Sequence, residues 1–244
     1  MTKLFEREDG RLPHQLRPVT FELHYTRWAE GSVLVKFGQT HVLCNATLDD
    51  KLPNWLRYGD ASHGWVTAEY ALLPRSTHSR VGRETRWPKG RTQEISRLIG
   101  RSLRMAVDLE ALGQRQIIVD CDVLQADGGT RTAAITGGWV ALQLALNPLI
   151  AAGDVPPGVI RHQVAAISVG IVDNRLLLDL PYSEDVAAAV DLNVVMTAGG
   201  QLIEIQGTAE KAPFTIDQHH ALLQLAGQGI EALVELQQAA LETG

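Results

Sequence analysis

Residues 117–132 read Ile117-Ile118-Val119-Asp120-Cys121-Asp122-Val123-Leu124-Gln125-Ala126-Asp127-Gly128-Gly129-Thr130-Arg131-Thr132, a β-type run that ends in an acidic, glycine-rich turn. The alternation of apolar and polar residues predicts a strand over Gln116–Gln125. The apolar pattern that begins near Thr132 predicts a helix to about Asn147. This stretch therefore predicts a strand, a turn and a helix in direct succession.

The turn between them has the composition of an anion site. Gly128 and Gly129 lack the Cβ atoms that would keep a ligand away from the backbone, and Thr130 can cap the following helix. Arg131 adds a planar cation suited to phosphate oxygens, at a helix end whose dipole favours an anion. The alternative is a strand-to-helix turn in which these residues only shape the backbone, because short glycine motifs have many false positives.

On the N-terminal side of this unit the chain is rich in short β-type runs. Alternation and flanking turn residues predict four strands, at Val19–Tyr25, Ser32–Phe37, His41–Leu48 and Trp65–Tyr70. A helix is predicted over Thr92–Leu112, where one apolar stripe contains Ile95, Leu98, Ile99, Met105, Leu109 and Leu112 and Gly113 supplies a stop.

On the C-terminal side, four more strands precede a long helix. The strands are predicted at Val164–Val172, Arg175–Leu180, Leu192–Met196 and Leu202–Gln206. The helix is expected to start with a capping box at Thr215 and Gln218 and to run toward Glu242, with Leu222, Leu225, Leu233 and Leu236 facing inward. Gly227 and Gly229 within it predict close packing or a kink. Blocks of strands punctuated by helices, with no obvious linker, predict a single mixed α/β domain over residues 1–244.

Length and composition suit a globular protein with a substantial core. The chain has 244 residues, of which 45% are hydrophobic. The charged N-terminus, Met1–Gly10, is unlike a signal peptide, so we expect a cytoplasmic protein that does not act at a membrane. Cys44 and Cys121 lie within β-type runs without CxxC spacing, which favours buried, reduced thiols.

Charge is distributed unevenly along the chain. Between Arg75 and Arg104 there are nine basic residues and two acids, a net charge of +7, against −6 for the whole chain. Eight of the nine are arginines, which favours phosphate contacts, although a solvated loop and helix face would have the same charge. The segment is expected to guide a polyanion to one place on an acidic body.

Two pairs of acids are candidates for metal chemistry. Asp185 and Asp191 flank a small-residue segment between two predicted strands, where paired carboxylates could hold Mg²⁺ or transfer a proton. Asp120 and Asp122 compete with them, because alternate residues of a strand point to one face. The printed sequence has no HExxH, GxSxG, Walker or GxGxxG pattern to support other enzyme classes.

The residues resemble the ribonuclease PH family almost from end to end. The similar segments are Gln15–Val19, Glu30–Leu34, Gly64–Tyr70, Leu73–Arg75, Gly90–Thr92, Glu94–Ile95, Asp120–Thr132, Ala165–Ile171, Asp191–Met196 and Gln206–Glu210. The resemblance implies a phosphate-dependent 3′-to-5′ exoribonuclease that trims tRNA precursors and other RNA and releases nucleoside 5′-diphosphates reversibly. It also implies a β-α-β-α fold similar to the second domain of ribosomal protein S5, and a homo-oligomer, a hexameric ring of dimers.

The same resemblance assigns roles by motif. It implies that Arg91, Gly129, Thr130 and Arg131 bind the co-substrate, inorganic phosphate, and that Asp185 and Asp191 are catalytic acids associated with Mg²⁺. Three further arginines are expected to receive RNA, namely Arg75, Arg80 and Arg83. The chain departs from the family in one place. The family usually has a longer Lys/Gly-rich stretch before the arginine that corresponds to Arg91, whereas this chain has the shorter segment Glu84–Gly90, which contains Trp87 and Pro88.

Two rival functions come from other classes. A catalytically silent, RNA-binding subunit of an exosome-like ring would keep the fold without activity. A metal-dependent nuclease that uses water would need no phosphate pocket. The joint presence of Arg91, Arg131, Asp185 and Asp191 favours phosphorolysis, in which the protein must neutralise and align like-charged groups.

Overall fold

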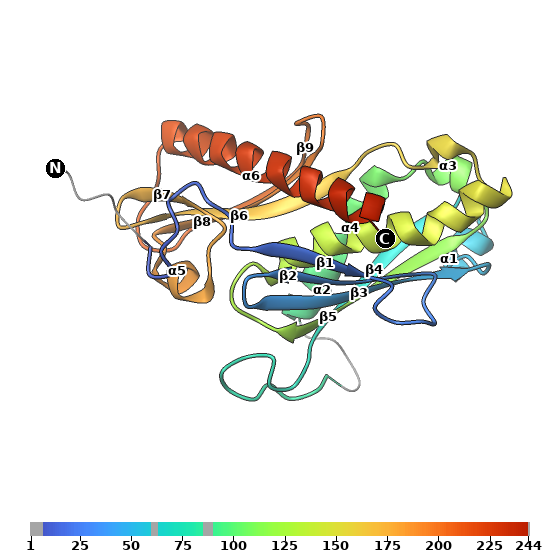
Figure 1. The fold of residues 1–244 in the computed structure, drawn as a ribbon, viewed down its shortest axis with the longest axis horizontal. Coiled ribbons are helices and arrows are strands. Elements are labelled where there is room, and N and C mark those ends of the chain that lie inside the picture. Colours follow the sequence, from blue (N-terminus) through green and yellow to red (C-terminus); the bar gives the residue numbers. More distant parts are fainter. Residues whose placement is uncertain (1–6, 60–62, 85–89, 244) are drawn as a thin grey trace.

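A computed structural model describes residues 7–59, 63–84 and 90–243, and it contains two β-sheets joined by helices (Figure 1). The first sheet has five strands in the order β1-β2-β3-β5-β4. Their bounds are β1 Val19–Leu23, β2 Gly31–Phe37, β3 Thr40–Asp49, β4 Trp65–Leu72 and β5 Gln116–Gln125. Neighbouring strands are antiparallel except β4 and β5, which are parallel and are connected through helices.

The second sheet has four antiparallel strands in the order β7-β6-β8-β9. Their bounds are β6 Val164–Val172, β7 Arg175–Leu178, β8 Val190–Thr197 and β9 Leu202–Ala209. Strand β6 is buried along its whole length, as its continuous apolar sequence requires. The strand predictions are confirmed for all nine strands, with differences only at their ends.

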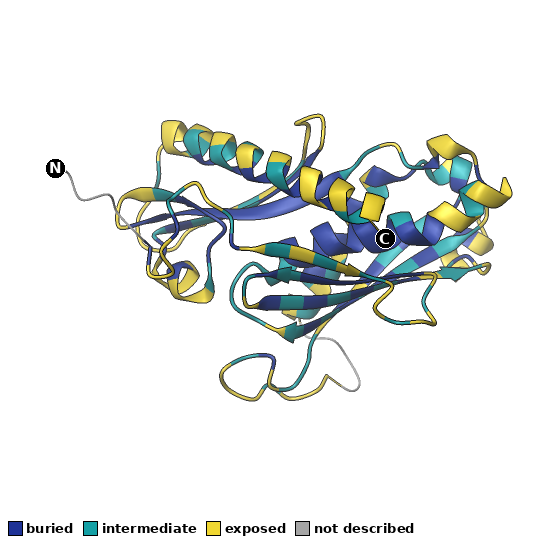
Figure 2. Cartoon of the chain, in the orientation of Figure 1, coloured by how far each residue is buried: buried dark blue, intermediate teal, exposed yellow. Residues whose placement is uncertain are grey.

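Helix α4, Thr130–Ala152, is the centre of the core. It packs against β2 and β3 of the first sheet and against β6 of the second. Most of its residues are buried, as the colouring of Figure 2 shows. By length and composition α4 could cross a membrane, but 72% of its most apolar window is buried inside the protein. The other helical segments are α1 Asn54–Arg57, α2 Gly90–Ala106, α3 Leu109–Leu112, the 3-10 turn Pro157–Val159, α5 Tyr182–Ala187 and α6 Ile216–Thr243.

The helix predicted over Thr92–Leu112 is two helices. Helix α2 ends at Ala106 because Val107 pairs with Ile160, and Asp108 then caps α3 by accepting hydrogen bonds from the N–H groups of Glu110 and Ala111. Met105, expected to face the core, is 54% exposed.

Helix α4 also differs from the prediction at both ends. It continues past Asn147 and through Pro148, because Leu149 and Ile150 pack against the core and extend the buried face. Its N-cap is Gly129, in the left-handed conformation, and not Thr130. Thr130 is the first helical residue, so its hydroxyl is available for another contact.

Helix α6 begins with the predicted capping box. The Thr215 N–H donates to Gln218 Oε1 at 2.8 Å, and the Gln218 N–H donates to Thr215 Oγ1 at 3.1 Å. Leu222 and Leu233 are buried as expected, whereas Leu236 is 38% exposed.

The two glycines of α6 behave differently. A Cβ at Gly229 would lie 2.6 Å from Leu178, so the predicted close packing is confirmed there, but a Cβ at Gly227 would meet nothing within 4 Å.

The two cysteines are buried, as predicted. They are also direct neighbours, since Cys44 of β3 is opposite Cys121 of β5, and both thiols point at the carbonyl of Ala134. Sequence spacing alone did not indicate this pairing. Both side chains therefore belong to the interface between the first sheet and α4.

Candidate active site

One cleft of about 720 Å³ contains every predicted phosphate-binding and catalytic residue. It is bounded by the loop after β4, the first turn of α2, the β5–α4 turn, helix α5 and strand β8. The predicted residues that line it are Arg91, Gly129, Thr130, Arg131, Asp185 and Asp191. Residues up to 100 positions apart in sequence thus line one cleft.

The β5–α4 turn requires glycine at two successive positions. Gly128 and Gly129 have φ angles of 71° and 65°, in the left-handed region. A Cβ at Gly128 would also lie 2.4 Å from the carbonyl oxygen of Leu180. Because Gly129 has no side chain to cap α4, the first N–H groups of that helix are left to face the cleft, which suits an anion.

Neighbouring elements orient the two side chains that follow these glycines. The Thr130 hydroxyl lies 2.8 Å from the hydroxyl of Tyr70 in β4. Arg131 Nη1 donates to Gln206 Oε1 at 2.7 Å and to Glu94 Oε1 at 3.2 Å. Arg131 is thus held from β9 and α2, which reduces the freedom that it would lose on binding phosphate.

The catalytic candidates Asp185 and Asp191 have different neighbours in the cleft. Burial raises the pKa of Asp185, and the charges of Arg91 and Arg131 oppose that rise. Burial also raises the pKa of Asp191, and the nearby carboxylates of Asp185 and Glu210 raise it further. A cation between the two aspartates would remove this repulsion.

The donor set fits Mg²⁺. Asp191 Oδ1 is buried and has no hydrogen-bond partner among the described residues. This oxygen could therefore bind a cation without giving up another contact that the structure describes. Within the described part of the chain no group of three or more His, Cys, Asp or Glu side chains forms a complete metal cage. Mg²⁺ commonly binds one or two carboxylates and completes its shell with water and substrate phosphates, which matches this arrangement.

Sequence reasoning missed Tyr70 and Glu210, which line the same cleft. Both belong to segments noted for their family resemblance, Gly64–Tyr70 and Gln206–Glu210, but neither was given a role. Glu210 N–H donates to the carbonyl of Ala189, which fixes the chain beside Asp191. The charge of Glu210 raises the pKa of both Asp185 and Asp191. Glu210 follows β9, and its position beside Asp191 depends on the pairing of β8 with β9, which no local sequence pattern indicates.

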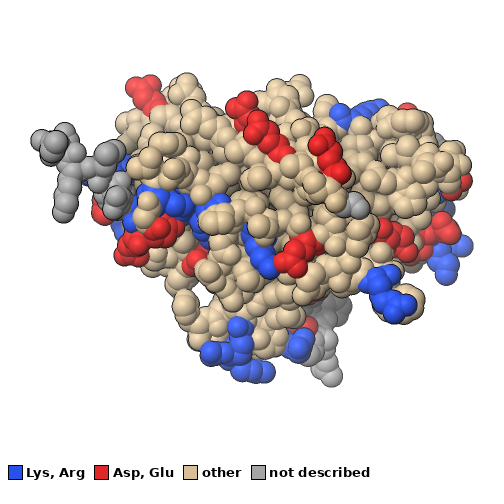
Figure 3. Space-filling view, viewed as in Figure 1, with Lys and Arg blue, Asp and Glu red and all other residues tan. Residues whose placement is uncertain are grey.

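The three predicted RNA-binding arginines lie on the loop that follows β4. Basic side chains gather at the end of that loop in Figure 3. Arg80 and Arg83 are exposed, and Arg75, at a φ of 69°, donates to the His78 carbonyl at 3.0 Å. None of the three lines the cleft, although residues 77–79 of the same loop do. The three arginines therefore lie outside the cleft lining, on a loop that supplies part of it.

Not all of the basic segment is available to a polyanion. Arg101 forms an ion pair with Glu204, and Arg104 donates to the Val66 carbonyl and lies over the Trp65 ring. These two arginines of the predicted basic segment therefore have partners within the chain. The sequence departure at Trp87 and Pro88, like Arg86 and Lys89, lies outside the described residues.

The competing pair, Asp120 and Asp122, is located elsewhere. Both side chains point to the face of β5 opposite the core, as the strand period predicted. Burial and the charge of Glu69 raise the pKa of each. Neither lines the cleft, whereas Asp185 and Asp191 both do, together with residues of the β5–α4 turn.

Comparisons with known proteins agree with this geometry. Residues 15–148 match the model of the 3′ exoribonuclease family, domain 1, and residues 162–229 match domain 2 of the same family. The chain is 56% identical to the ribonuclease PH of Moorella thermoacetica, an alignment that covers 96% of this chain and 94% of that protein. It is also 56% identical to the ribonuclease PH of Methylocella silvestris, over 96% and 99% of the two chains.

Solved structures support the fold. Rrp46 from rice, Oryza sativa, superposes with a TM-score of 0.78 at 17% identity, over 96% of this chain and all of that chain. A chain of the Archaeoglobus fulgidus exosome with RNA bound to the active site gives 0.77 at 23% identity, over 94% and 92% of the two chains. The predicted ribonuclease PH fold is therefore confirmed, and the chain belongs to the 3′ exoribonuclease family, as a relative of ribonuclease PH.

Proposed function

We propose that this protein is a phosphate-dependent 3′-to-5′ exoribonuclease that uses Mg²⁺, trims tRNA precursors and other RNA, and releases nucleoside 5′-diphosphates. The single observation that carries the proposal is the composition of one cleft. It joins Arg91, the glycine turn with Arg131, and the acid pair Asp185 and Asp191. Its relatives named ribonuclease PH, at 54–56% identity, support the reaction class.

The reaction is a displacement between two anions. An oxygen of inorganic phosphate attacks the last phosphodiester of the RNA, a new phosphoanhydride bond forms, and the bond to the 3′ oxygen of the preceding nucleotide breaks. The departing 3′ oxygen takes a proton. Because a phosphoester is exchanged for a phosphoanhydride, the reaction is reversible, and nucleotides can be added from diphosphates.

The protein's part is to align charges that repel one another. Arg131 and the open N-terminus of α4 would hold the attacking phosphate, and Arg91 faces them from α2. Asp185 and Asp191 would hold Mg²⁺, which supplies positive charge to the developing oxyanions. Preorganised charges of this kind contribute most in a cleft that excludes water.

RNA would approach over the loop after β4. Arg80 and Arg83 are exposed on the loop whose residues 77–79 line the cleft, which supports a role in contacting the phosphates of a long substrate away from the last bond. Arg75, whose guanidinium is turned toward the loop's own backbone, would contribute less. We infer a cytoplasmic homo-oligomer, a hexameric ring formed by three dimers, in which each cleft acts on one RNA end.

A non-catalytic ring subunit is the second candidate, because two of the structural relatives come from exosome assemblies. The complete set of arginines and acids in this cleft favours the enzyme. A hydrolytic nuclease would share the acids but would not need Arg131 at an uncapped helix end.

In the test, the purified protein and Mg²⁺ are incubated with RNA, with and without inorganic phosphate. One sample of the RNA is labelled at its 5′ end to follow shortening, and another is labelled uniformly to identify the released nucleotides. The proposal expects stepwise shortening from the 3′ end only with phosphate, with nucleoside diphosphates as products. Shortening without phosphate, or monophosphate products, would move the protein to the hydrolytic class. Binding of RNA without shortening under either condition would identify the silent subunit.

A further inference from the structure

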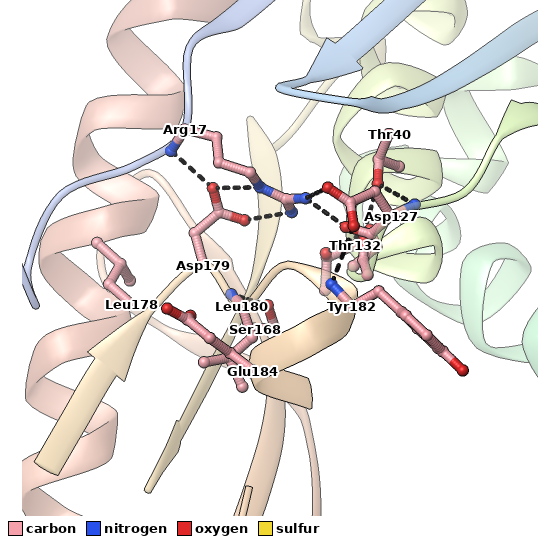
Figure 4. Close-up of polar contacts among 12 residues, drawn as sticks. Arg17, Thr40, Asp127, Thr132, Ser168, Leu178, Asp179, Leu180, Tyr182 and Glu184 are labelled. Atoms are coloured by element: carbon pink, nitrogen blue, oxygen red, sulfur yellow. Dashed lines mark hydrogen bonds and ion pairs between the residues drawn. The ribbon is translucent and has the colours of Figure 1, made fainter. Parts of the chain in front are cut away.

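A buried arginine connects the β5–α4 turn, which contains Asp127 and the proposed phosphate-binding residues, with the segment that leads into α5. Arg17 lies between Asp179 and Asp127, as Figure 4 shows. Its Nε and Nη2 donate to the two carboxylate oxygens of Asp179, at 3.0 and 2.7 Å, and its Nη1 donates to the carbonyl oxygen of Asp127 at 2.5 Å. The side chains of Arg17 and Asp179 are only 4% and 1% exposed.

Asp179 fixes the segment between β7 and α5. It has a φ of 55°, a left-handed conformation that is uncommon for a residue with a side chain. Its N–H donates to the Ser168 carbonyl at 2.7 Å, and its Oδ2 also accepts from the backbone N–H of Arg17 at 2.8 Å. A buried ion pair with this many hydrogen bonds permits one arrangement of the chain and disfavours others.

Asp127 makes the second connection, from the turn to the helix itself. Its Oδ1 accepts a hydrogen bond at 3.2 Å from the N–H of Tyr182, the first residue of α5. The backbones also touch, since a Cβ at Gly128 would lie 2.8 Å from Tyr182 N. Asp185 is one helical turn beyond Tyr182 and is therefore carried by the same contact.

Thr40 holds the turn from the opposite side. Its hydroxyl donates to the Gly128 carbonyl at 2.6 Å and accepts from the Asp127 N–H at 2.9 Å. The turn is therefore attached at three points, to β3 through Thr40, to Arg17, and to α5 through the Asp127 carboxylate.

We propose that Arg17 and Asp127 are positioning residues that set the distance between the phosphate-binding turn, Gly129–Arg131, and the catalytic candidate Asp185. The proposal rests on the function proposed above. Phosphorolysis requires the attacking phosphate and the acid that holds the metal to be aligned, and a displacement of about 1 Å can cost about a hundredfold in rate. Neither residue lines the cleft, so each acts through the elements that it joins.

Two substitutions at Asp127 test the proposal, one that removes the carboxylate and one that conserves its shape. In Asp127→Ala the acceptor for the Tyr182 N–H is lost, whereas Asp127→Asn keeps an oxygen at that position. We expect Asp127→Ala to raise the KM for phosphate about tenfold and to lower kcat. Asp127→Asn should restore both to within about twofold of the unmodified protein.

Arg11 provides the matched control. It also contacts the buried aspartate, with Nη1 3.6 Å from Asp179 Oδ2, but no described contact joins it to the turn. Arg11→Ala should change thermal stability and leave the KM for phosphate unchanged. Arg17→Lys keeps a cation beside Asp179, but its single nitrogen cannot span Asp179 and the Asp127 carbonyl as the three guanidinium nitrogens do. Its KM for phosphate should therefore rise as in Asp127→Ala.

A second readout does not depend on turnover. Inorganic phosphate that binds the folded protein raises the Tm, and the stabilisation grows with the logarithm of the phosphate concentration relative to its Kd. The phosphate concentration that gives the same rise in Tm should be about tenfold higher in Asp127→Ala than in Asp127→Asn. In an Arg131→Ala background, Asp127→Ala should add little, because both changes act on the same phosphate contact.

Three results would overturn the proposal: an Asp127→Ala variant that uses phosphate as Arg11→Ala does, an Asp127→Asn variant as impaired as Asp127→Ala, or full additivity with Arg131→Ala. An unmodified protein that shortens RNA without phosphate would instead contradict the proposed function. The two failures are therefore distinguishable.

Discussion

At the scale of single residues, Asp191 is the carboxylate with the most unusual surroundings. Its Oδ1 is buried without a hydrogen-bond partner among the described residues, and two neighbouring carboxylates raise its pKa in addition to burial. Such a group is unfavourable in a protein without metal and favourable once a cation is bound. The local environment is therefore suited to metal binding more than to stability.

Asp185→Asn and Asp191→Asn should each lower turnover by at least about a hundredfold, because they remove charge at the reacting centre with little change in size. RNA binding should be nearly unchanged. Single-turnover rates and filter binding on the same RNA measure the two effects.

Asp120→Asn is the control for these variants, since Asp120 is also partly buried but lies away from the cleft. A near-normal rate in Asp191→Asn together with a large loss in Asp120→Asn would transfer the catalytic role to the β5 pair.

The raised pKa values of Asp185 and Asp191 predict a pH dependence of turnover. As pH falls through these raised values, the carboxylates take up protons and lose Mg²⁺, so activity should begin to fall at a pH above the usual aspartate value of 3.8. Since protons and metal compete, tenfold more Mg²⁺ should move this acidic limb to lower pH. A limb that does not respond to Mg²⁺ would contradict the assignment.

The raised pKa values of Asp185 and Asp191 also determine how these two groups change the stability of the fold with pH. A carboxyl group whose folded-state pKa is raised stabilises the fold at low pH, and that contribution is lost as pH rises through the raised value. At neutral pH without metal, the charge of Asp191 therefore opposes folding.

At the scale of elements, α4 determines how closely the two sheets approach. Gly31 of β2 meets this helix so tightly that a Cβ would lie 1.9 Å from the Ala141 carbonyl oxygen. Gly31→Ala should therefore lower the free energy of unfolding by about 1–3 kcal/mol through overpacking. Gly158→Ala, where a Cβ would meet nothing within 4 Å, should have little effect. Urea denaturation of both variants checks this, and equal stabilities would contradict the packing account.

The elements also show how far local patterns could predict this fold. Strands were predictable because alternation reports directly on which face of a strand is buried. The break between α2 and α3 was not, since Val107 leaves the helix to pair with Ile160, more than 50 residues further on. Thr130 was assigned as a cap for a similar reason, because its partner Tyr70 comes from a distant strand.

The residues of the site were predictable as a set but not in their arrangement. Arginines, glycines and acids in family-like motifs identified the cleft's residues, and all six line it. Glu210 and the connections made by Arg17 depend on β8–β9 pairing and on the packing of the chain's N-terminal segment, which no single motif contains. The specific roles of the six residues remain predictions for experiment.

At the scale of the whole molecule, a chain with a net charge of −6 carries a basic loop, whose residues 77–79 line the cleft. Basic side chains gather at the end of this loop in Figure 3. Joint replacement of Arg80 and Arg83 by Ala should weaken binding of a tRNA precursor. The slope of log affinity against log salt should flatten by up to about 0.7 to 0.9 for each lost phosphate contact. A short single-stranded oligonucleotide, which need not reach the loop, should be degraded at nearly the original rate.

Light scattering on the same variant separates RNA docking from assembly. The account expects an unchanged particle mass, that of six chains. A smaller particle with equal loss on both RNAs would place these arginines at a subunit interface. An intact particle with unchanged tRNA binding would remove them from the RNA surface.

The origin of the atoms in the product tests the central claim most directly. RNA should be degraded with Mg²⁺ and isotopically labelled inorganic phosphate in water enriched in ¹⁸O, and the released nucleotides should be analysed by mass spectrometry. Phosphorolysis predicts nucleoside diphosphates that carry the label in the terminal phosphate and no ¹⁸O from water. Nucleoside monophosphates that contain ¹⁸O, with no label from phosphate, would contradict the account.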